Sequence, residues 1–338
     1  MNRELVHLTQ PLSDEVDHCL QAQWSENSEW HTVSTHDTVL ALVPQMTKRA
    51  FVGAELCRNA EWLDIAISFT INRAIAVQAI QAWPWILQPV GVRRQIQRAR
   101  DILMPVLERE RQVMHSKDMS TDRVFSTLTF IDQYANGSRY DATMAQLRLT
   151  AVSVLTTSDM VEKVLARICE YPELIQPLRE EAILAVESGG LHHKSLLKLT
   201  LMESVMKESQ RLEPATLISM FRVAKRTVIL QDGTTIPKGT SVAFANDLRL
   251  DPVMYPDPEK FDDYRFEEMR KDPEQASLPH SPRQEQAIWL SVMGNTLVLY
   301  DLKALDGRVP DLHIRGMFIQ RDTGGMLSVR RRQEEVTL

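Results

Sequence analysis

The chain has 338 residues, 43% hydrophobic and 25% charged, and its 39 basic and 45 acidic side chains give a formal net charge of −6. This composition excludes a disordered or fibrous chain, and the mild acidity argues against a nucleic-acid partner. The three cysteines, Cys19, Cys57 and Cys169, form no Cys-x-x-Cys pair, which argues against a disulfide framework or closed zinc site and favours a reducing compartment.

The beginning of the chain carries no apolar core of signal-peptide length. Its most apolar stretch, Trp62–Leu87, is interrupted by polar and charged residues and by Pro84. These interruptions favour an amphipathic helix over Trp62–Ile80 rather than a membrane span. No transmembrane segment is therefore predicted in this chain.

Helical spacing of apolar residues dominates the chain before residue 215. The predicted helices are Ser13–Trp24, Thr38–Phe51, Cys57–Ile80, Val92–Met114, Asp141–Glu170, Pro172–Val186 and Ser195–Leu212. The longest, Asp141–Glu170, is apolar on most faces between Leu147 and Ile168. A helix that is apolar on most faces is normally buried, so this one should cross the middle of the domain.

Strand signals begin after residue 215. Thr227–Leu230 and Thr234–Pro237 flank Asp232-Gly233, a strong hairpin turn, and Thr240–Ala245 follows as a further strand. Two irregular segments come next, a proline-containing meander and a polar loop, at Asp251–Arg265 and Lys271–Gln286. The fold class predicted from these elements is mainly α with a small β part, a long central helix plus a β hairpin region after residue 215.

The pair Glu208 and Arg211 stands out among several Glu-x-x-Arg spacings, because Glu208 shares an apolar helical stripe with Leu201, Val205 and Leu212. A carboxylate on such a stripe must be paired, since an unpaired buried charge is costly. The pattern favours a buried structural ion pair. A surface pair and a catalytic acid remain as alternatives.

Two further sets of side chains could carry chemistry. Thr156 and Thr157 lie in the middle of the longest helix, where hydroxyls either bond the preceding turn of a core helix or face a pocket and relay a proton. Arg222 and Arg265 could recognise a carboxylate, although each is singly more typical of a surface. Arg265 lies between aromatic residues, which indicates partial burial.

The order of these features resembles the cytochrome P-450 family of haem-thiolate monooxygenases. It is most similar to the fungal branch that oxidises terpenoid-derived secondary metabolites, which includes enzymes similar to ent-kaurene oxidase. Four phrases carry the resemblance: Ser25–Trp30 (SENSEW), Phe51–Trp62 (FVGAELCRNAEW), Pro172–Glu180 (PELIQPLRE) and Lys207–Pro214 (KESQRLEP).

The resemblance implies particular roles for the candidate residues. Glu208, Arg211 and Arg265 would form a buried structural triad, and Arg222 would contact a haem propionate. Thr156, with Thr157 beside it, would belong to the oxygen-activating helix. The family often places an acid just before that threonine, and here the position is Leu155.

One departure from the family concerns the metal ligand. The resemblance implies haem as the cofactor, held by a cysteine thiolate in a loop after the arginine meander, and no cysteine follows Cys169. We therefore expect residues 1–276 to be a P-450-like core of a truncated fold, without the family's membrane anchor and first sheet. Residues 277–299 would be a degenerate segment where the ligand loop is expected. Residues 300–338 would be a C-terminal remnant, with Tyr300–Lys303 as the end of a helix and Leu327–Arg332 as the closing strand.

Two hypotheses on function follow. The first is a monooxygenase of fungal secondary metabolism that oxidises a small hydrophobic, terpenoid substrate, with electrons from an NADPH-cytochrome reductase. Full-length members would be anchored to the endoplasmic reticulum on its cytoplasmic side. The alternative is a haemless, catalytically inactive remnant or binding protein, because no axial cysteine and hence no metal ligand is present in this chain.

Overall fold

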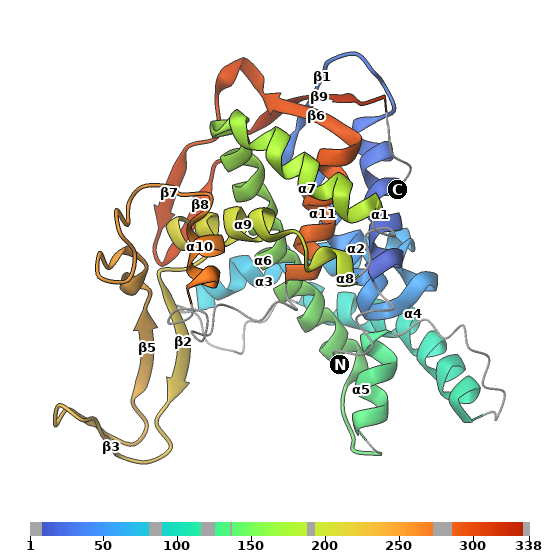
Figure 1. Cartoon of the computed structure of the whole chain (residues 1–338). Helices are drawn as coiled ribbons and strands as arrows, with labels where there is room; N and C mark the ends of the chain where they lie inside the picture. Colours follow the sequence, from blue (N-terminus) through green and yellow to red (C-terminus); the bar gives the residue numbers. More distant parts are fainter. Residues whose placement is uncertain are drawn as a thin grey trace.

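A computed structural model shows a helical body with small antiparallel sheets at its edges (Figure 1), so the predicted mainly α fold class is confirmed. The structure describes residues 9–80, 90–115, 126–135, 137–187, 193–272 and 286–333. Among these residues, none of the helices combines the length and apolar character that crossing a membrane requires. Most of the predicted loop Lys271–Gln286 lies outside the described residues.

The helices before the central one follow the predicted pattern with shifted ends. They are α1 (Thr9–Trp24), α2 (Thr35–Cys57), α3 (Ala60–Ile80), α4 (Val90–His115) and α5 (Thr127–Ala135), of which α5 was not predicted. Helix α2 is kinked at Gly53, whose φ of 82° belongs to the left-handed region that glycine adopts without strain. A serine cap starts α2, because the Ser34 hydroxyl accepts a hydrogen bond from the Asp37 backbone N–H.

The central helix is α6 (Ala142–Glu170), which crosses the body as predicted (Figure 1). Asp141 caps its N-terminus by accepting a hydrogen bond from the Met144 N–H. Its first half joins one hydrophobic core with α3 and α4, and its second half joins a larger core with α1, α2, α7, α9 and α11. One stripe of α6 is nevertheless open to solvent: Val152 is 65% exposed and Leu155 46%.

The region after α6 contains η3 (Pro172–Leu174), α7 (Ile175–Glu187), α8 (His193–Leu196) and α9 (Thr200–Leu212). The prediction of one continuous helix over Ser195–Leu212 was wrong. The Glu181 carboxylate of α7 accepts hydrogen bonds from the Leu201 and Met202 backbone N–H groups, at 2.8 and 2.9 Å. This carboxylate caps a new helix start, and a cap supplied by a distant segment leaves no local sequence signal.

The last helix and the main sheet are continuous. Helix α11 (Gln286–Leu299) runs directly into β6 (Tyr300–Ala304), so the prediction that Tyr300–Lys303 ends a helix was wrong. The sheet has the order β1-β9-β6, with β1 at His31–Ser34 and β9 at Met326–Arg331, and both pairings are antiparallel. Tyr300 becomes a strand residue because Arg331 of β9 is its ladder partner.

Three smaller ladders complete the fold. The first pairs β2 (Ile218–Val223) with β5 (Ser241–Ala245) and extends away from the helical body, ending in the β3 (Val228–Ile229) and β4 (Thr235–Ile236) hairpin (Figure 1). That hairpin turns at Gly233, as predicted. The third ladder pairs β7 (Leu312–Arg315) with β8 (Phe318–Arg321). Short helices η4 (Asp247–Leu250), α10 (Arg265–Lys271) and η5 (Leu305–Gly307) lie between the strands.

Candidate functional site

The structure brings Glu208, Arg211 and Arg265 into one buried cluster. Arg211 binds Glu208 with two hydrogen bonds of 2.7 Å, from Nε and Nη2, and Arg265 Nε donates to Glu208 Oε1 at 3.0 Å. The Asp262 backbone N–H donates to the same oxygen at 3.2 Å. Glu208 is 0% exposed. This geometry excludes the surface-pair alternative and leaves the carboxylate no access to solvent.

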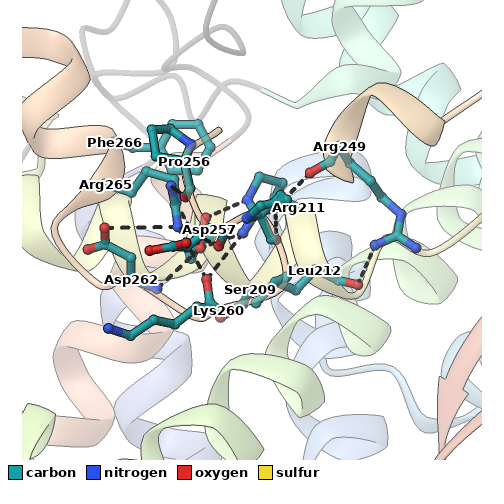
Figure 2. Close-up of polar contacts among 12 residues, drawn as sticks. Ser209, Arg211, Leu212, Arg249, Pro256, Asp257, Lys260, Asp262, Arg265 and Phe266 are labelled. Carbon is teal, nitrogen blue, oxygen red and sulfur yellow. Dashed lines mark hydrogen bonds and ion pairs between the residues drawn. The ribbon is translucent and has the colours of Figure 1, made fainter. Parts of the chain in front are cut away.

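The same two guanidinium groups also hold the irregular meander that follows η4. Arg211 Nη1 donates to the carbonyls of Arg249 and Pro258, each at 2.6 Å, and Arg265 Nη1 donates to the Pro256 carbonyl at 2.7 Å (Figure 2). These carbonyls belong to no regular ladder, so the arginines supply the donors that secondary structure would otherwise provide. The cluster therefore ties α9 and the start of α10 to the meander.

The two threonines of α6 face different environments. Thr156 is exposed beside Leu155, and its hydroxyl donates to the Val152 carbonyl one turn earlier at 3.0 Å. Thr157 is buried in the protein interior. Thr156 therefore lies on the open stripe of α6, where a ligand could reach it, whereas Thr157 is positioned to support the helix from within.

Arg222 lies on β2, and its side chain is exposed. Its Nη1 donates to the backbone carbonyl of its neighbour Phe221 at 2.8 Å. The described structure thus places it on the ladder that extends from the body, outside the Glu208 cluster. Its role as a propionate ligand remains a prediction.

A second ion-pair cluster, which the sequence reading missed, joins α6 to the β7–β8 hairpin. Arg321 of β8 donates to Glu213 through Nε and to Glu170 through Nη1, both at 2.9 Å, and Arg167 pairs with the same two carboxylates. Lys163 lies one turn earlier and donates to the Ile319 carbonyl of β8 at 2.8 Å. Arg321 lies more than 100 positions from Glu170 and from Glu213 in the sequence, so no local spacing pattern predicts that they pair.

A cavity of about 230 Å³ lies between α2, α3, α6 and the β7–β8 hairpin. Leu40, Ile67 and Leu155 give it an apolar side, and Ser158, Asp159 and Glu162 line its polar side. Among the residues that the structure describes, the buried Ser158 hydroxyl has no hydrogen-bond partner. Such a mixture of apolar wall and few polar groups is typical of a small-molecule site.

Each of the two carboxylates of this cavity, Asp159 and Glu162, has a basic side chain beside it that partly offsets the effect of burial on its pKa. Burial raises the pKa of Asp159, and Lys163 opposes that rise through an ion pair of 2.6 Å. Burial likewise raises the pKa of Glu162, while the His36 imidazole, 2.8 Å away, lowers it. Both groups therefore hold a proton more readily than an exposed carboxyl would.

The residues present fit haem only in part. The open stripe of α6, with Val152, Leu155 and Thr156, offers an apolar face beside a hydroxyl. The thiol groups do not fit, because burial raises the pKa of Cys19 and of Cys169 to about 12, and a metal binds the thiolate. Cys169 is also separated from Thr156 by 13 residues of α6, roughly 20 Å along the helix axis. The described residues contain no cluster of His, Cys, Asp and Glu side chains that could hold a metal ion.

Comparison with known proteins identifies the family. The Cytochrome P450 family profile matches residues 6–282. The chain is 76% identical over 366 residues to cytochrome P450 monooxygenase roqO of Penicillium rubens, covering 100% of this chain and 73% of that protein. It is 57% identical over 362 residues to fumitremorgin C monooxygenase of Neosartorya fischeri, covering 99% and 72%.

A third relative is more distant in sequence and is matched over the same extent. Cytochrome P450 monooxygenase notH of an Aspergillus species is 46% identical over 365 residues, covering 100% of this chain and 72% of that protein. The family implies a haem cofactor and a reductase as electron source. With a family match over residues 6–282 and relatives of this similarity, the chain belongs to the cytochrome P450 family.

Proposed function

We propose that the chain derives from a monooxygenase that oxidises a small hydrophobic secondary metabolite. The observation that carries the proposal is the 76% identity to roqO, which covers 100% of this chain. The matched region includes the Glu208 cluster, the open stripe of α6 and the cavity, because it covers the whole of this chain. Electrons would come from an NADPH-cytochrome reductase, as the family implies.

The cavity supports the hydrophobic class of substrate. Leu40, Ile67 and Leu155 would pack against an apolar body, while Ser158 and Asp159 offer oxygen atoms to a hydrogen-bond donor of the ligand. A terpenoid remains our proposed substrate class, and the name of the Neosartorya fischeri relative adds fumitremorgin C as a second compound to test.

Product analysis tests this proposal. A variant of the chain with the roqO segment described in the next subsection is supplied with haem, a fungal reductase and NADPH. It is incubated separately with fumitremorgin C and with a terpenoid hydrocarbon, and products are analysed by mass spectrometry. A product heavier by one oxygen atom supports the proposal. Absence of product from a preparation that shows the thiolate haem spectrum contradicts it for these two compounds.

A second candidate function is that of a haemless binding protein. The observation that favours it is the lack of any cysteine after Cys169. Binding is tested with the same two compounds by isothermal titration calorimetry on protein free of haem. Saturable binding to that protein, weakened by Leu155→Asp at the cavity wall, supports this candidate, and no binding contradicts it.

A further inference from the structure

The chain as it stands has no suitable thiolate to offer to haem iron. Residues 170–338 contain no cysteine. Of the three cysteines before them, Cys19 and Cys57 are buried and Cys169 is half-buried. Cys19 and Cys57 are buried near the Glu15 carboxylate, which disfavours a second negative charge, and Cys57 Sγ lies 3.9 Å from Glu15 Oε1. Burial thus keeps these thiols protonated, whereas a metal takes the thiolate.

The relatives carry residues that this chain lacks inside the matched region. The match to roqO spans 366 positions against 338 residues of this chain, a difference of 28, and the match to notH spans 365, a difference of 27. The two relatives differ widely in identity to the chain, 76% and 46%. The match to lenC of Aspergillus lentulus, 43% identical, spans 388 positions, a difference of 50, so that relative carries further residues as well. The nearly equal differences for roqO and notH, at such unequal identities, favour one discrete block that these two relatives share.

The end of the family match indicates where in the sequence that block is missing. The match begins at residue 6 and stops at residue 282, although α11, β6 and β9 continue the fold beyond it. These later elements are specifically packed: Asn295 of α11 exchanges hydrogen bonds with Ser13 of α1, and Arg179 of α7 donates to the Leu297 carbonyl at 2.8 Å. The continuous packing of α11 and the end of the family match together favour a junction between residue 282 and Gln286.

We propose that this chain lacks one contiguous segment of about 28 residues between residue 282 and Gln286, and that this segment supplies the thiolate in its relatives. The remaining fold does not ligate haem through a thiolate. Because α11 and the sheet behind it keep their packing, returning the segment restores ligation without rebuilding the core.

Spectroscopy of matched variants tests the proposal. The chain, and a variant with the corresponding roqO segment inserted after Pro282, are produced with haem supplied, reduced, and exposed to carbon monoxide. We expect the red-shifted Soret band of a thiolate complex only in the insertion variant. The control carries the same insertion with its cysteine replaced by serine, and we expect it to lose the band.

The reciprocal variant keeps the test decisive if the insertion misfolds. Deleting the same segment from roqO should abolish its thiolate band while far-ultraviolet circular dichroism retains the helical signal. A thiolate band in the unmodified chain, or in roqO without the segment, overturns the proposal. So does an insertion variant with the helical signal of the chain and no band. A band without product in the mass-spectrometric assay counts against the proposed function alone.

Discussion

Glu208 is an acceptor for two guanidinium groups and one backbone N–H in a site closed to solvent. Glu208→Gln keeps the shape of the side chain and removes its charge. Arg211 is then buried without a counter-ion, and Arg265 keeps only the more exposed Asp262 carboxylate, 3.9 Å away. Breaking a buried ion pair by removing one partner costs about 3–5 kcal/mol. We expect a loss of that size in the free energy of unfolding, measured by urea denaturation.

The matched control for this change is Glu61→Gln. Glu61 pairs with Arg98 at 2.8 Å, and both side chains are exposed, so the loss should stay below about 1 kcal/mol. Equal losses in the two variants would show that the Glu208 cluster contributes no more than a surface pair.

Lys48 of α2 is fully buried, and its Nζ has no hydrogen-bond partner among the described residues. Burial lowers the pKa of Lys48 to about 7. Above that pH the folded state holds fewer protons than the unfolded state, whose lysine titrates near pH 10.4. The contribution of Lys48 to stability is therefore smallest below pH 7 and increases as the pH rises.

Unfolding measured at pH 7.5 and 8.5 tests this expectation. This interval avoids the titration of ordinary carboxyl groups, and the folded protein should gain up to about 1.4 kcal/mol from Lys48 across one pH unit. Lys48→Met preserves the length of the side chain, so it should lose this gain and be more stable than the parent at pH 7.5. Parallel pH profiles for parent and variant would contradict the pKa shift.

At the scale of single elements, the β7–β8 hairpin depends on the Arg321 cluster. Arg321→Gln removes the cation between Glu170 and Glu213, so these carboxylates repel each other more strongly. We expect local opening of the hairpin to become easier by about 3 kcal/mol, equivalent to roughly 100-fold faster exchange of the Ile319 amide hydrogen. Hydrogen exchange followed by mass spectrometry measures this.

Arg315 provides the control in the same hairpin. It is exposed at the end of β7, so Arg315→Gln should leave the exchange of Ile319 within about twofold of the parent. If both variants accelerate exchange alike, the hairpin is held by its own ladder rather than by the ion pairs with α6.

The elements differ in how far the sequence could predict them. Local periodicity was sufficient for α6, and Asp232-Gly233 for its hairpin, because each signal is complete within a short segment. Strand β1 was missed since its ladder partner is β9, almost 300 residues later, and the break before α9 was missed since Glu181 of α7 supplies the cap. Such elements depend on tertiary contacts that propensity does not contain.

The residues of the candidate site likewise differ in how far the sequence could predict them. Glu208 and Arg211 are neighbours on one helix turn, so spacing alone paired them, and the family resemblance was needed to add Arg265 from a segment 57 residues away. Arg321 and Glu213 carry no such motif, and only the fold brings them together. The absence of a cysteine after Cys169 was readable directly from the sequence, whereas the size of the missing segment required comparison with relatives.

For the whole molecule, the distribution of apolar surface is uneven. Helix α6 connects both hydrophobic cores, so the helical body is well packed. The β2–β5 ladder instead projects from it (Figure 1). Apolar side chains of this ladder are open to solvent, among them Phe221 at 57% and Phe244 at 58% exposure. A two-stranded ladder is marginal alone in water, and exposed apolar edges favour pairing with other chains.

We therefore expect the purified chain to associate through this ladder as its concentration rises. Phe221→Lys combined with Phe244→Lys places charges on the exposed strands, which disfavours edge pairing while leaving the buried cores untouched. Sedimentation velocity should show a smaller associated fraction for the double variant than for the parent. Val253→Lys, a highly exposed change outside the ladder, should leave association as in the parent. Association that persists in the double variant would place the contact elsewhere, and the open stripe of α6 at Val152 and Leu155 is one exposed apolar surface to substitute next.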